Sequence, residues 1–372
     1  MNFTHVYVDW YISTFVFYLC LILGTYYITN LTKNKYIIGF IRKKQKLWAI
    51  IVPAVLFFIK GFGTTGRDLR AGYYYNFTNA ISLSKFPDYT VETGYRLLNV
   101  IVRNMTDQYW IFIAVVAVLT LFPVFKILKK YSNKIDLPIA VLMYVSLFFV
   151  NSFSPLRMCL AASIGLFAFD AIVERKTLKA LVWIIIASFF HTSALVLFIP
   201  YFFTQAKGMN KKMIAISLIG VFFVVFLGRN SITSLLASDE RYYIYQAFDS
   251  VSIGFEQFIY YIPLIYVVLA ARKYDTDNHF LLVSFSFVAT AFFVGLLGYV
   301  ISIFGRFRDM FLPLIIIVPY YVKLLKINRP KYKILISIIA IIYCIARFYI
   351  FISQYYNMED LMPYTNIFGW VI

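Results

Sequence analysis

Long apolar runs constrain this chain more than any other feature of its sequence. The clearest are Tyr11–Ile28, Tyr109–Phe125, Met213–Leu227, Phe280–Phe304 and Ile334–Ile352. A helix needs about 20 apolar residues to cross the hydrocarbon core of a bilayer, and these runs approach or exceed that length. Charged residues make up only 14% of the chain, too few to cover a soluble surface. The sequence therefore predicts an all-α polytopic membrane protein, with residues 1–372 forming a single integral membrane domain.

The net charge of +18 is distributed unevenly along the chain. Six short segments, which we assign to the cytoplasm, hold 23 of the 35 basic residues but only 4 of the 17 acidic ones. They are 30–46, 126–136, 174–179, 207–212, 272–279 and 323–333. An excess of Lys and Arg in short loops is typical of the cytoplasmic side of membrane proteins. Topology thus accounts for the positive charge, and its placement gives no support to nucleic-acid binding.

With these loops inside, the apolar segments alternate across the membrane. We expect about ten crossings and both termini outside; the crossings are 11–29, 47–60, 108–126, 137–151, 157–173, 213–228, 258–271, 280–304, 308–323 and 334–352. Two outer-face loops follow, at about 60–107 and 229–257. Apolar residues recur at helical spacing at 73–81 and again at 97–105, which predicts short amphipathic helices lying on the membrane surface.

The apolar stretch 180–203 does not fit a single crossing. Basic residues flank it on both sides, at 175–179 and 207–212, so both of its ends should face the cytoplasm. Phe190-His191-Thr192-Ser193 interrupts it near the middle. We therefore expect a re-entrant hairpin with arms of roughly 11 residues, or about 16 Å, against a hydrocarbon core of about 30 Å. Two steep, short crossings would satisfy the same flanking charges.

Outside the six basic segments, arginine is more frequent than lysine. Those segments hold 19 Lys and 4 Arg, whereas the rest of the chain holds 2 Lys and 10 Arg. Guanidinium groups bind phosphates and carboxylates in bidentate fashion. Arg157, Arg306 and Arg308 lie where two inward-running helices are expected to begin, and helix N-termini favour anions. We expect these three arginines to bind a pyrophosphate at the outer face; the alternative is that they snorkel to lipid headgroups.

Three residues are candidates for acid–base chemistry. His191 lies deep in an apolar run at the expected helix break, and ionisable groups inside membranes often line pathways. The alternative is an ordinary buried core histidine. Asp68 and Glu92 lie in the first outer loop, and either carboxylate could deprotonate a sugar hydroxyl. The alternative for each is a solvated loop acid.

No motif in the sequence calls for a metal or another cofactor. The chain has no P-loop, no GxSxG element and no zinc-spaced set of His and Cys. Asp275-Thr276-Asp277 matches a metal-binding DxD, but it falls on the cytoplasmic side, away from the arginines. The three cysteines all lie in apolar runs and imply no disulfide framework.

These residues resemble the EpsG/Wzy-type bacterial polysaccharide polymerases. The specific part is the run 157–164 followed, after a basic turn, by 187–195. Gly66-x-Asp68, Glu92-x-Gly94-Tyr95, Arg306 before a span and Pro363-Tyr364 also occur in the order typical of that family, over nearly the whole chain. Two features depart from the pattern, because Lys60 stands where an arginine is expected and Tyr73 lies one residue further from Asp68.

The resemblance implies an enzyme of O-antigen, capsule or exopolysaccharide assembly in the bacterial cytoplasmic (inner) membrane. Such polymerases transfer a growing glycan from undecaprenyl pyrophosphate onto a second lipid-linked repeat unit at the outer face. The implied partners are these lipid-linked oligosaccharides, membrane lipid and a chain-length regulator. Because the lipid pyrophosphate is the leaving group, we expect a metal-independent glycosyltransferase. His191, Asp68 and Glu92 remain alternative bases, and a lipid-linked oligosaccharide flippase or other transporter or a membrane O-acyltransferase remain alternative functions.

Overall fold

The computed structural model describes residues 11–38, 44–70, 72–88, 90–237 and 256–372. The α-helices are α1 (Ile12–Thr32), α2 (Trp48–Gly61), α3 (Arg67–Arg70), α4 (Gly72–Thr78), α5 (Thr93–Met105), α6 (Tyr109–Tyr131), α7 (Leu137–Tyr144), α8 (Leu156–Val173), α9 (Thr177–Ser188), α10 (Phe198–Gln205), α11 (Lys211–Leu227), α12 (Arg229–Ala237), α13 (Glu256–Ala271), α14 (Asn278–Val300), α15 (Leu314–Asn328) and α16 (Lys333–Tyr355).

Shorter elements connect these helices. A π-helical turn, η2 (Val145–Phe149), continues α7, and the 3₁₀ helices are η1 (Leu83–Lys85), η3 (Asn151–Phe153), η4 (Thr192–Leu197), η6 (Arg272–Tyr274), η7 (Ser302–Met310) and η8 (Pro330–Tyr332). Strands β1 (Tyr36–Ile38) and β2 (Lys44–Lys46) pair antiparallel in one small hairpin. The predicted all-α membrane fold is confirmed in its helical character.

Five helices are long and apolar enough to cross a membrane. They are α1, α6, α8, α14 and the helix over Pro330–Tyr355, and two bent pairs, α11 with α12 and η7 with α15, raise the number to seven if each is one span. Among the described residues, α2, α7 with η2, α9 and η4 with α10 are apolar but shorter. Length and composition thus support a polytopic membrane protein, and the count of ten crossings stays a prediction.

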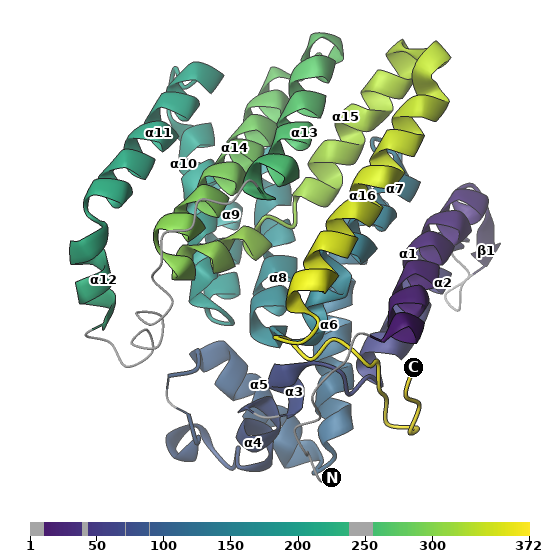
Figure 1. Cartoon of the computed structure of the whole chain (residues 1–372), viewed down its shortest axis with the longest axis vertical. Coiled ribbons are helices and arrows are strands. Elements are labelled where there is room, and N and C mark those ends of the chain that lie inside the picture. Colours follow the sequence, from purple (N-terminus) through teal and green to yellow (C-terminus); the bar gives the residue numbers. More distant parts are fainter. Residues whose placement is uncertain (1–10, 39–43, 71, 89, 238–255) are drawn as a thin grey trace.

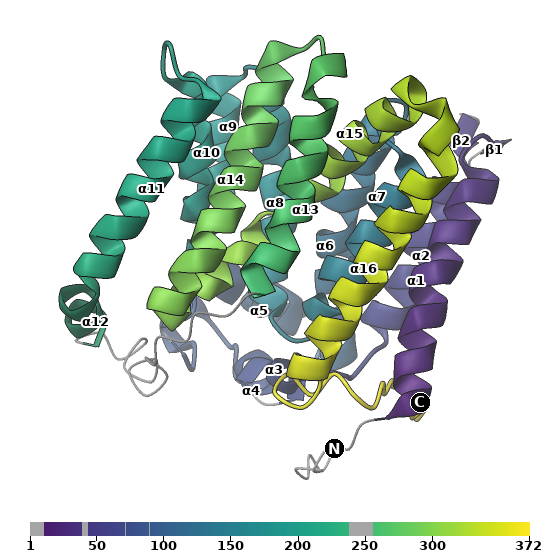
Figure 2. The same cartoon turned by 45° about the horizontal axis from the view of Figure 1, so that its top comes forward.

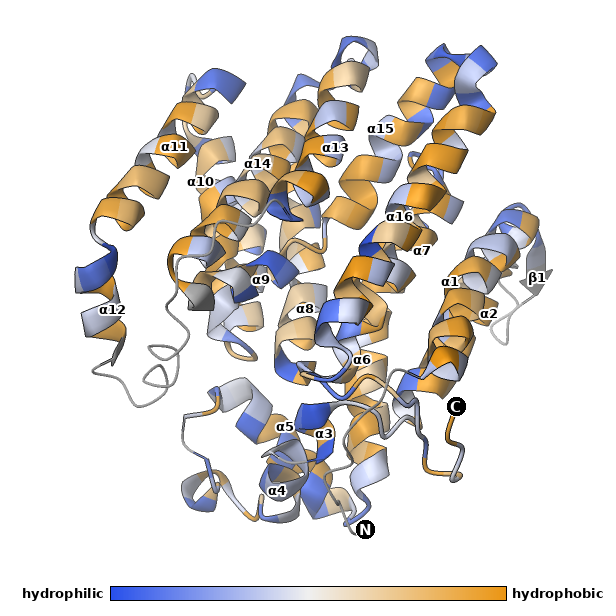
Figure 3. Cartoon of the chain, viewed as in Figure 1, coloured by the Kyte–Doolittle hydropathy of each residue, from blue (hydrophilic) through white to orange (hydrophobic). Residues whose placement is uncertain are grey.

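The basic loops gather at one end of the helical bundle, which we call the basic end (Figure 1). The Lys46 ammonium donates to Ser132 and Asn133 at 2.7 and 3.0 Å, and the Lys326 ammonium pairs with Asp136 at 2.6 Å. The opposite end, the loop end, carries α3, α4, α5 and the final residues of the chain. Hydrophilic residues lie at both ends, with apolar helix surfaces between them (Figure 3). This arrangement agrees with the predicted grouping of the loops.

Helix α8 lies at the centre of the bundle (Figure 2). In its most apolar stretch 78% of the residues are buried, against 11% for α16, which lies at the periphery. Small residues along α8, including Ala161, Ala162 and Gly165, allow neighbouring helices to approach closely. Arg157 therefore lies at the start of a helix that is largely buried in the bundle.

The first loop at the loop end has a hydrophobic core of its own. Tyr73, Phe77 and Ala80 are buried there with Tyr95 and Val102. The predicted helices are present as α4 and α5, but the apolar face of α4 packs into this core. The prediction that it lies on the membrane surface was wrong for these residues, because α5 and α6 cover them. On α5, an apolar row formed by Leu97, Ile101 and Met105 remains exposed, as expected for a helix at a membrane surface.

The stretch 180–203 folds as a helical hairpin. Helix α9 ends at Ser188, the chain turns at 189–191, and η4 and α10 lead back. The Thr177 hydroxyl donates to the Gln205 side chain at 3.1 Å, which joins the beginning of the hairpin to its end. Both flanks therefore lie together, as the basic residues on either side predict.

Candidate functional site

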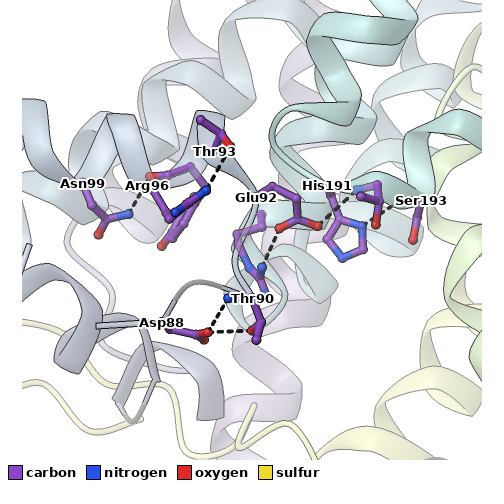
Figure 4. A network of polar contacts seen from close by, with 11 residues as sticks. Asp88, Thr90, Glu92, Thr93, Arg96, Asn99, His191 and Ser193 are labelled. Atoms are coloured by element: carbon purple, nitrogen blue, oxygen red, sulfur yellow. Dashed lines mark hydrogen bonds and ion pairs between the residues drawn. The ribbon is translucent and has the colours of Figure 1, made fainter. Parts of the chain in front are cut away.

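Glu92 connects the first loop to two other elements at the loop end. One carboxylate oxygen accepts from Arg157 Nη1 at 2.6 Å, and the other accepts the backbone N–H of Thr192 at 3.1 Å. Glu92 thus holds the start of α8 and the hairpin turn together. Figure 4 shows its carboxylate pointing toward the turn that carries His191 and Ser193. The side chains of Glu92 and Arg157 are 12% and 26% exposed, so solvent screens this ion pair only in part.

A close backbone approach fixes the position of Glu92. The N–H of Gly94 donates to the carbonyl oxygen of Phe189 at 2.8 Å. A Cβ atom on Gly94 would lie 2.7 Å from that same oxygen, inside any normal contact distance. Only glycine lets the loop lie this close to the hairpin, which explains the Glu92-x-Gly94 spacing.

The imidazole of His191 has a defined tautomer in this arrangement. Its Nδ1 atom accepts the backbone N–H of Ser193 at 3.2 Å, which also caps η4. An atom that accepts an N–H carries no proton, so the proton of the neutral ring is on Nε2. Burial, helped by the charges of Arg157 and Arg306 and opposed by Glu92, lowers the pKa of His191 to about 4. The ring is therefore neutral at pH 7 and presents Nε2–H as a donor.

Asp68 shares an electrostatic neighbourhood with the same arginines. Burial raises the pKa of Asp68 above its ordinary value, and the positive charges of Arg157, Arg306 and Arg67 oppose that rise. Arg157 and Arg306, about 150 residues apart in sequence, thus act on one carboxylate and on His191. That the two arginines converge on one outward-open cavity stays a prediction.

Two tyrosines enclose the guanidinium of Arg157. The ring centroids of Tyr73 and Tyr95 each lie 5.9 Å from it, and the two rings are 5.4 Å apart. Burial raises the pKa of Tyr73 to about 12, so its hydroxyl stays protonated. The rings and Glu92 restrict the rotamers of Arg157, in contrast to an arginine that extends freely toward lipid.

The end of the chain holds the loop that carries Asp68. Backbone N–H groups of Gly66 and Arg67 donate to the carbonyls of Asp360 and Glu359 at 3.1 and 2.9 Å. Gly66 has a φ of +114°, and a Cβ there would lie 2.4 Å from the carbonyl oxygen of Phe153. Gly66 therefore allows the loop to lie directly against the segment that precedes α8, next to Arg157.

Glu359 is a member of this neighbourhood that sequence reasoning missed. The Ser154 hydroxyl donates to its carboxylate. Burial raises the pKa of Glu359, the negative charge of Asp68 adds to that rise, and Arg306 opposes it. Glu359 lies five residues before Tyr364 of the Pro363-Tyr364 element, and only that proximity could have indicated it.

Arg308 does not join the Arg157 cluster, in contrast to the sequence-based prediction. Arg306 and Arg308 lie in η7, a 3₁₀ helix with about three residues per turn. In such a helix, residues two positions apart point in directions about 120° apart. The side chains of Arg306 and Arg308 therefore face different sides of η7. Arg308 lines a separate cavity with Asp309 and Arg347. The prediction had assumed one surface for all residues at this helix start.

Other sequence features have structural roles. The buried Lys60 donates to the Ser152 hydroxyl at 2.8 Å and to the Ser152 carbonyl, so it ties α2 to the segment before α8. Asp275 accepts from the hydroxyls of Tyr320 and Tyr321 at 3.0 and 2.9 Å at the basic end. Within the described part of the chain, no group of three or more His, Cys, Asp or Glu side chains is arranged to hold a metal ion.

Comparison with known proteins assigns the chain to a family. The sequence model of the EpsG family matches residues 46–366, which include every residue of the arrangement described above. The comparisons with curated proteins and with solved structures give no match. The matched family corresponds to the polysaccharide polymerases that the sequence motifs resemble. The chain belongs to the EpsG family.

Proposed function

We propose that this chain polymerises a surface polysaccharide at the outer face of the bacterial cytoplasmic membrane. It transfers a growing glycan from undecaprenyl pyrophosphate onto a second lipid-linked repeat unit. The observation that carries this proposal is that Asp68 and His191 both lie within the electrostatic influence of Arg157 at the loop end of a chain from a polymerase family. Membrane lipid and a chain-length regulator are the other partners we infer.

Arg157 and Arg306 are the groups proposed to bind the leaving pyrophosphate. Arg157 is the second residue of α8, where unpaired backbone N–H groups and the helix dipole also favour an anion. Negative charge grows on the pyrophosphate as the glycosidic bond breaks. The Arg157 guanidinium, which Glu92 and the two tyrosines hold in place, stabilises that charge without reorganising, which is how such sites lower a barrier.

Glu92 acts as a positioning residue in this scheme. Both of its carboxylate oxygens already accept hydrogen bonds, from Arg157 and from the backbone of Thr192. A base needs a free lone pair directed at the hydroxyl it deprotonates. Glu92 is therefore poorly suited to act as the base.

His191 is proposed to donate a hydrogen bond to the pyrophosphate. Its Nδ1 accepts the Ser193 N–H, so the Nε2 atom carries the proton and cannot accept another. A neutral donor stabilises a phosphate oxygen without adding a buried charge next to two arginines. This role replaces that of a base, which would require the opposite tautomer.

Asp68 is proposed as the general base. Its carboxylate accepts no hydrogen bond from the described residues, and burial raises its pKa toward neutrality, which improves a base. The acceptor hydroxyl oxygen bonds to the anomeric carbon of the donor glycan, and its proton moves to Asp68. The bond from that carbon to the phosphate oxygen breaks, and its electron pair leaves with undecaprenyl pyrophosphate.

The glycan profile of a strain that lacks this chain tests the function. Without a polymerase, single repeat units reach the cell surface but long chains do not. Without a flippase, no repeat units reach the surface, and without an O-acyltransferase the chains have full length but lack acyl groups. The flippase and the acyltransferase are the alternatives that this profile separates. Surface glycans of full length would reject the polymerase assignment.

Cysteine labelling of intact cells tests the side of the membrane. A cysteine at Asp88, in the first loop, should react with an impermeant maleimide, and one at Lys211, at the basic end, should react only after permeabilisation. Labelling at 211 and protection at 88 would reverse the proposed orientation.

A further inference from the structure

A cavity at the loop side of α16 is lined by Arg308 and Arg347, and neither Arg157 nor Arg306 is among the residues that line it. It has a volume of about 40 Å³ and is lined by residues of α7, η2, η3, α13, η7, α15 and α16. Of the described residues that line it, three are charged: Arg308, Asp309 and Arg347. Tyr260, Tyr261, Tyr343 and Asn151 supply further polar groups.

Arg347 has hydrogen-bonding capacity that the protein does not use. Its Nε and Nη1 atoms are buried and have no hydrogen-bond partner among the described residues. The guanidinium stacks on Tyr260, 3.1 Å from the ring centroid, which holds the group in one orientation. Buried donors are nearly always paired in folded proteins, so unpaired N–H groups in a cavity point to a ligand.

The charge of the cavity favours an anion. Two guanidinium groups face a single carboxylate, since Arg308 Nε lies 3.7 Å from Asp309. One positive charge is left over in a site lined by the apolar helices α13 and α16. Ionisable residues inside a membrane protein are costly and tend to have a function, and arginine pairs suit phosphoryl oxygens.

The size of the cavity limits the ligand group that it accepts. A single water occupies roughly 10–15 Å³ on the same measure, so the cavity takes about three waters or one tetrahedral oxyanion. It has no room for a sugar. The π-helical turn η2 places Ser146, Leu147 and Phe148 in the cavity wall, and such turns occur frequently at functional sites.

We propose that Arg308 and Arg347 form a second oxyanion site that binds a phosphoryl group. This inference rests on the proposed polymerase function, in which two lipid pyrophosphates must be bound at the same time. Arg157 and Arg306 bind the pyrophosphate that leaves, and the Arg308–Arg347 cavity binds that of the other substrate. The arginines of η7 then serve different substrates because the 3₁₀ geometry directs them apart.

Native mass spectrometry of the purified full chain, with farnesyl pyrophosphate as the probe, tests this site by counting bound molecules. The wild type should bind two molecules, and Arg347→Gln should bind one, with at least about tenfold weaker binding at the lost site. Arg308→Gln is a second variant, and Arg229→Gln, at an arginine of α12, is the matched control. A thermal melt without ligand establishes that each variant is folded.

The outcomes separate the two proposals. Two bound molecules in a folded Arg347→Gln and Arg308→Gln would overturn the second site. If the wild type binds one farnesyl pyrophosphate and Arg157→Lys binds none, the second site is overturned but the polymerase proposal is left intact. No bound farnesyl pyrophosphate in the wild type would contradict both.

A parallel titration with inorganic pyrophosphate identifies the source of the phosphoryl group. If inorganic pyrophosphate at an equal concentration displaces the farnesyl pyrophosphate whose binding depends on Arg347, the site binds a free phosphate. Retention of farnesyl pyrophosphate there assigns it to a lipid-linked one. Either result requires binding that depends on Arg347, and binding that is independent of Arg347 would reject the proposal.

Discussion

Arg157 and Arg347 are both semi-buried arginines in an apolar bundle, but their surroundings differ. Arg157 pairs with Glu92 at 2.6 Å and lies against two tyrosine rings. Arg347 stacks on one ring, and its Nε and Nη1 atoms have no partner among the described residues. The Arg157 guanidinium has a carboxylate partner in Glu92 and only one buried donor, Nε, without a partner among the described residues. Arg347 has two such donors, Nε and Nη1.

Under the proposed function, this difference corresponds to two ways of binding a phosphate. A guanidinium that a neighbouring carboxylate already orients, as Glu92 orients Arg157, is prepared for charge that develops during a reaction. A guanidinium with unpaired donors gains most from a ligand that is already charged. We therefore expect chemistry at Arg157 and ground-state binding at Arg347.

The largest effect is expected at Asp68, beside Arg157. Loss of a general base typically lowers a rate by about 10²–10⁴, so Asp68→Asn should abolish most polymerisation. In the wild type, activity should fall as the pH falls through the pKa of Asp68, which lies above that of an ordinary aspartate. Rates of glycan elongation in membranes across pH 4–8 provide the measurement.

A rise in pH through the pKa of Asp68 should lower the stability of the protein, although it raises the activity. Because its folded pKa is raised, its contribution to stability is present below the unfolded pKa and is lost as the pH rises through the folded pKa. Asp68→Asn should therefore melt no lower than the wild type at pH 7. An inactive variant with a lower melting temperature would indicate a structural role instead.

The next effect concerns the geometry of the guanidinium at Arg157. Arg157→Lys keeps the charge but loses the fork that binds two oxygens. Loss of one well-placed donor costs roughly 10²–10³ in rate, so long glycans should disappear while the protein reaches the membrane in normal amount. Glycan gels beside a membrane-fraction blot measure both. Glycans of normal length in Arg157→Lys would instead support the alternative that Arg157 snorkels to lipid headgroups. They would also remove the contrast with Arg347.

Displacement of Glu92 should have a smaller effect. Gly94→Ala forces the loop away from the Phe189 carbonyl, and a shift of about 1 Å in a site can cost about 10²-fold. Gly72→Ala is the matched control, because a Cβ on Gly72 meets nothing within 4 Å. Elongation rates of the two variants should differ by about tenfold or more. Equal rates would show that the loop contact does not position Arg157.

The smallest effect is on the free energy of unfolding. Arg157→Leu leaves the Glu92 carboxylate without its partner, which should cost about 1–3 kcal/mol. Arg347→Leu removes donors that the protein does not pair, so the apo protein should be equally stable or more stable. Chemical unfolding in detergent gives both values. A large loss in Arg347→Leu would mean that the protein already satisfies this arginine.

The sequence was most informative where a physical rule acts locally. Apolar runs predicted helices, and basic residues flanking 180–203 predicted a hairpin whose ends now meet through Thr177 and Gln205. Arg157 could be identified because it combines a helix start with a family motif. The number of crossings was less predictable, since several helices are shorter than a full span and only packing decides how they lie.

Side-chain direction and long-range contacts were not predictable from the sequence. Nothing local distinguishes Arg306 from Arg308, and their separation depends on η7 being a 3₁₀ helix. Glu359 contacts the Asp68 loop across almost the whole chain, so no window of sequence contains both. Glu92 was indistinguishable from a solvated acid until the positions of Arg157 and Thr192 were known.

The contacts between the Asp68 loop and the end of the chain determine when this site can form during biosynthesis. The Thr65 hydroxyl accepts the backbone N–H of Thr365 at 2.7 Å, across 300 residues. Ribosomes add about 5–20 residues per second, so the loop is made roughly 15–60 s before its partner. Until then the Gly66 and Arg67 N–H groups lack the carbonyls of 359–360. The nascent chain would therefore insert its preceding helices first, and the loop that carries Asp68 would gain these contacts only after residues 359–365 have been made.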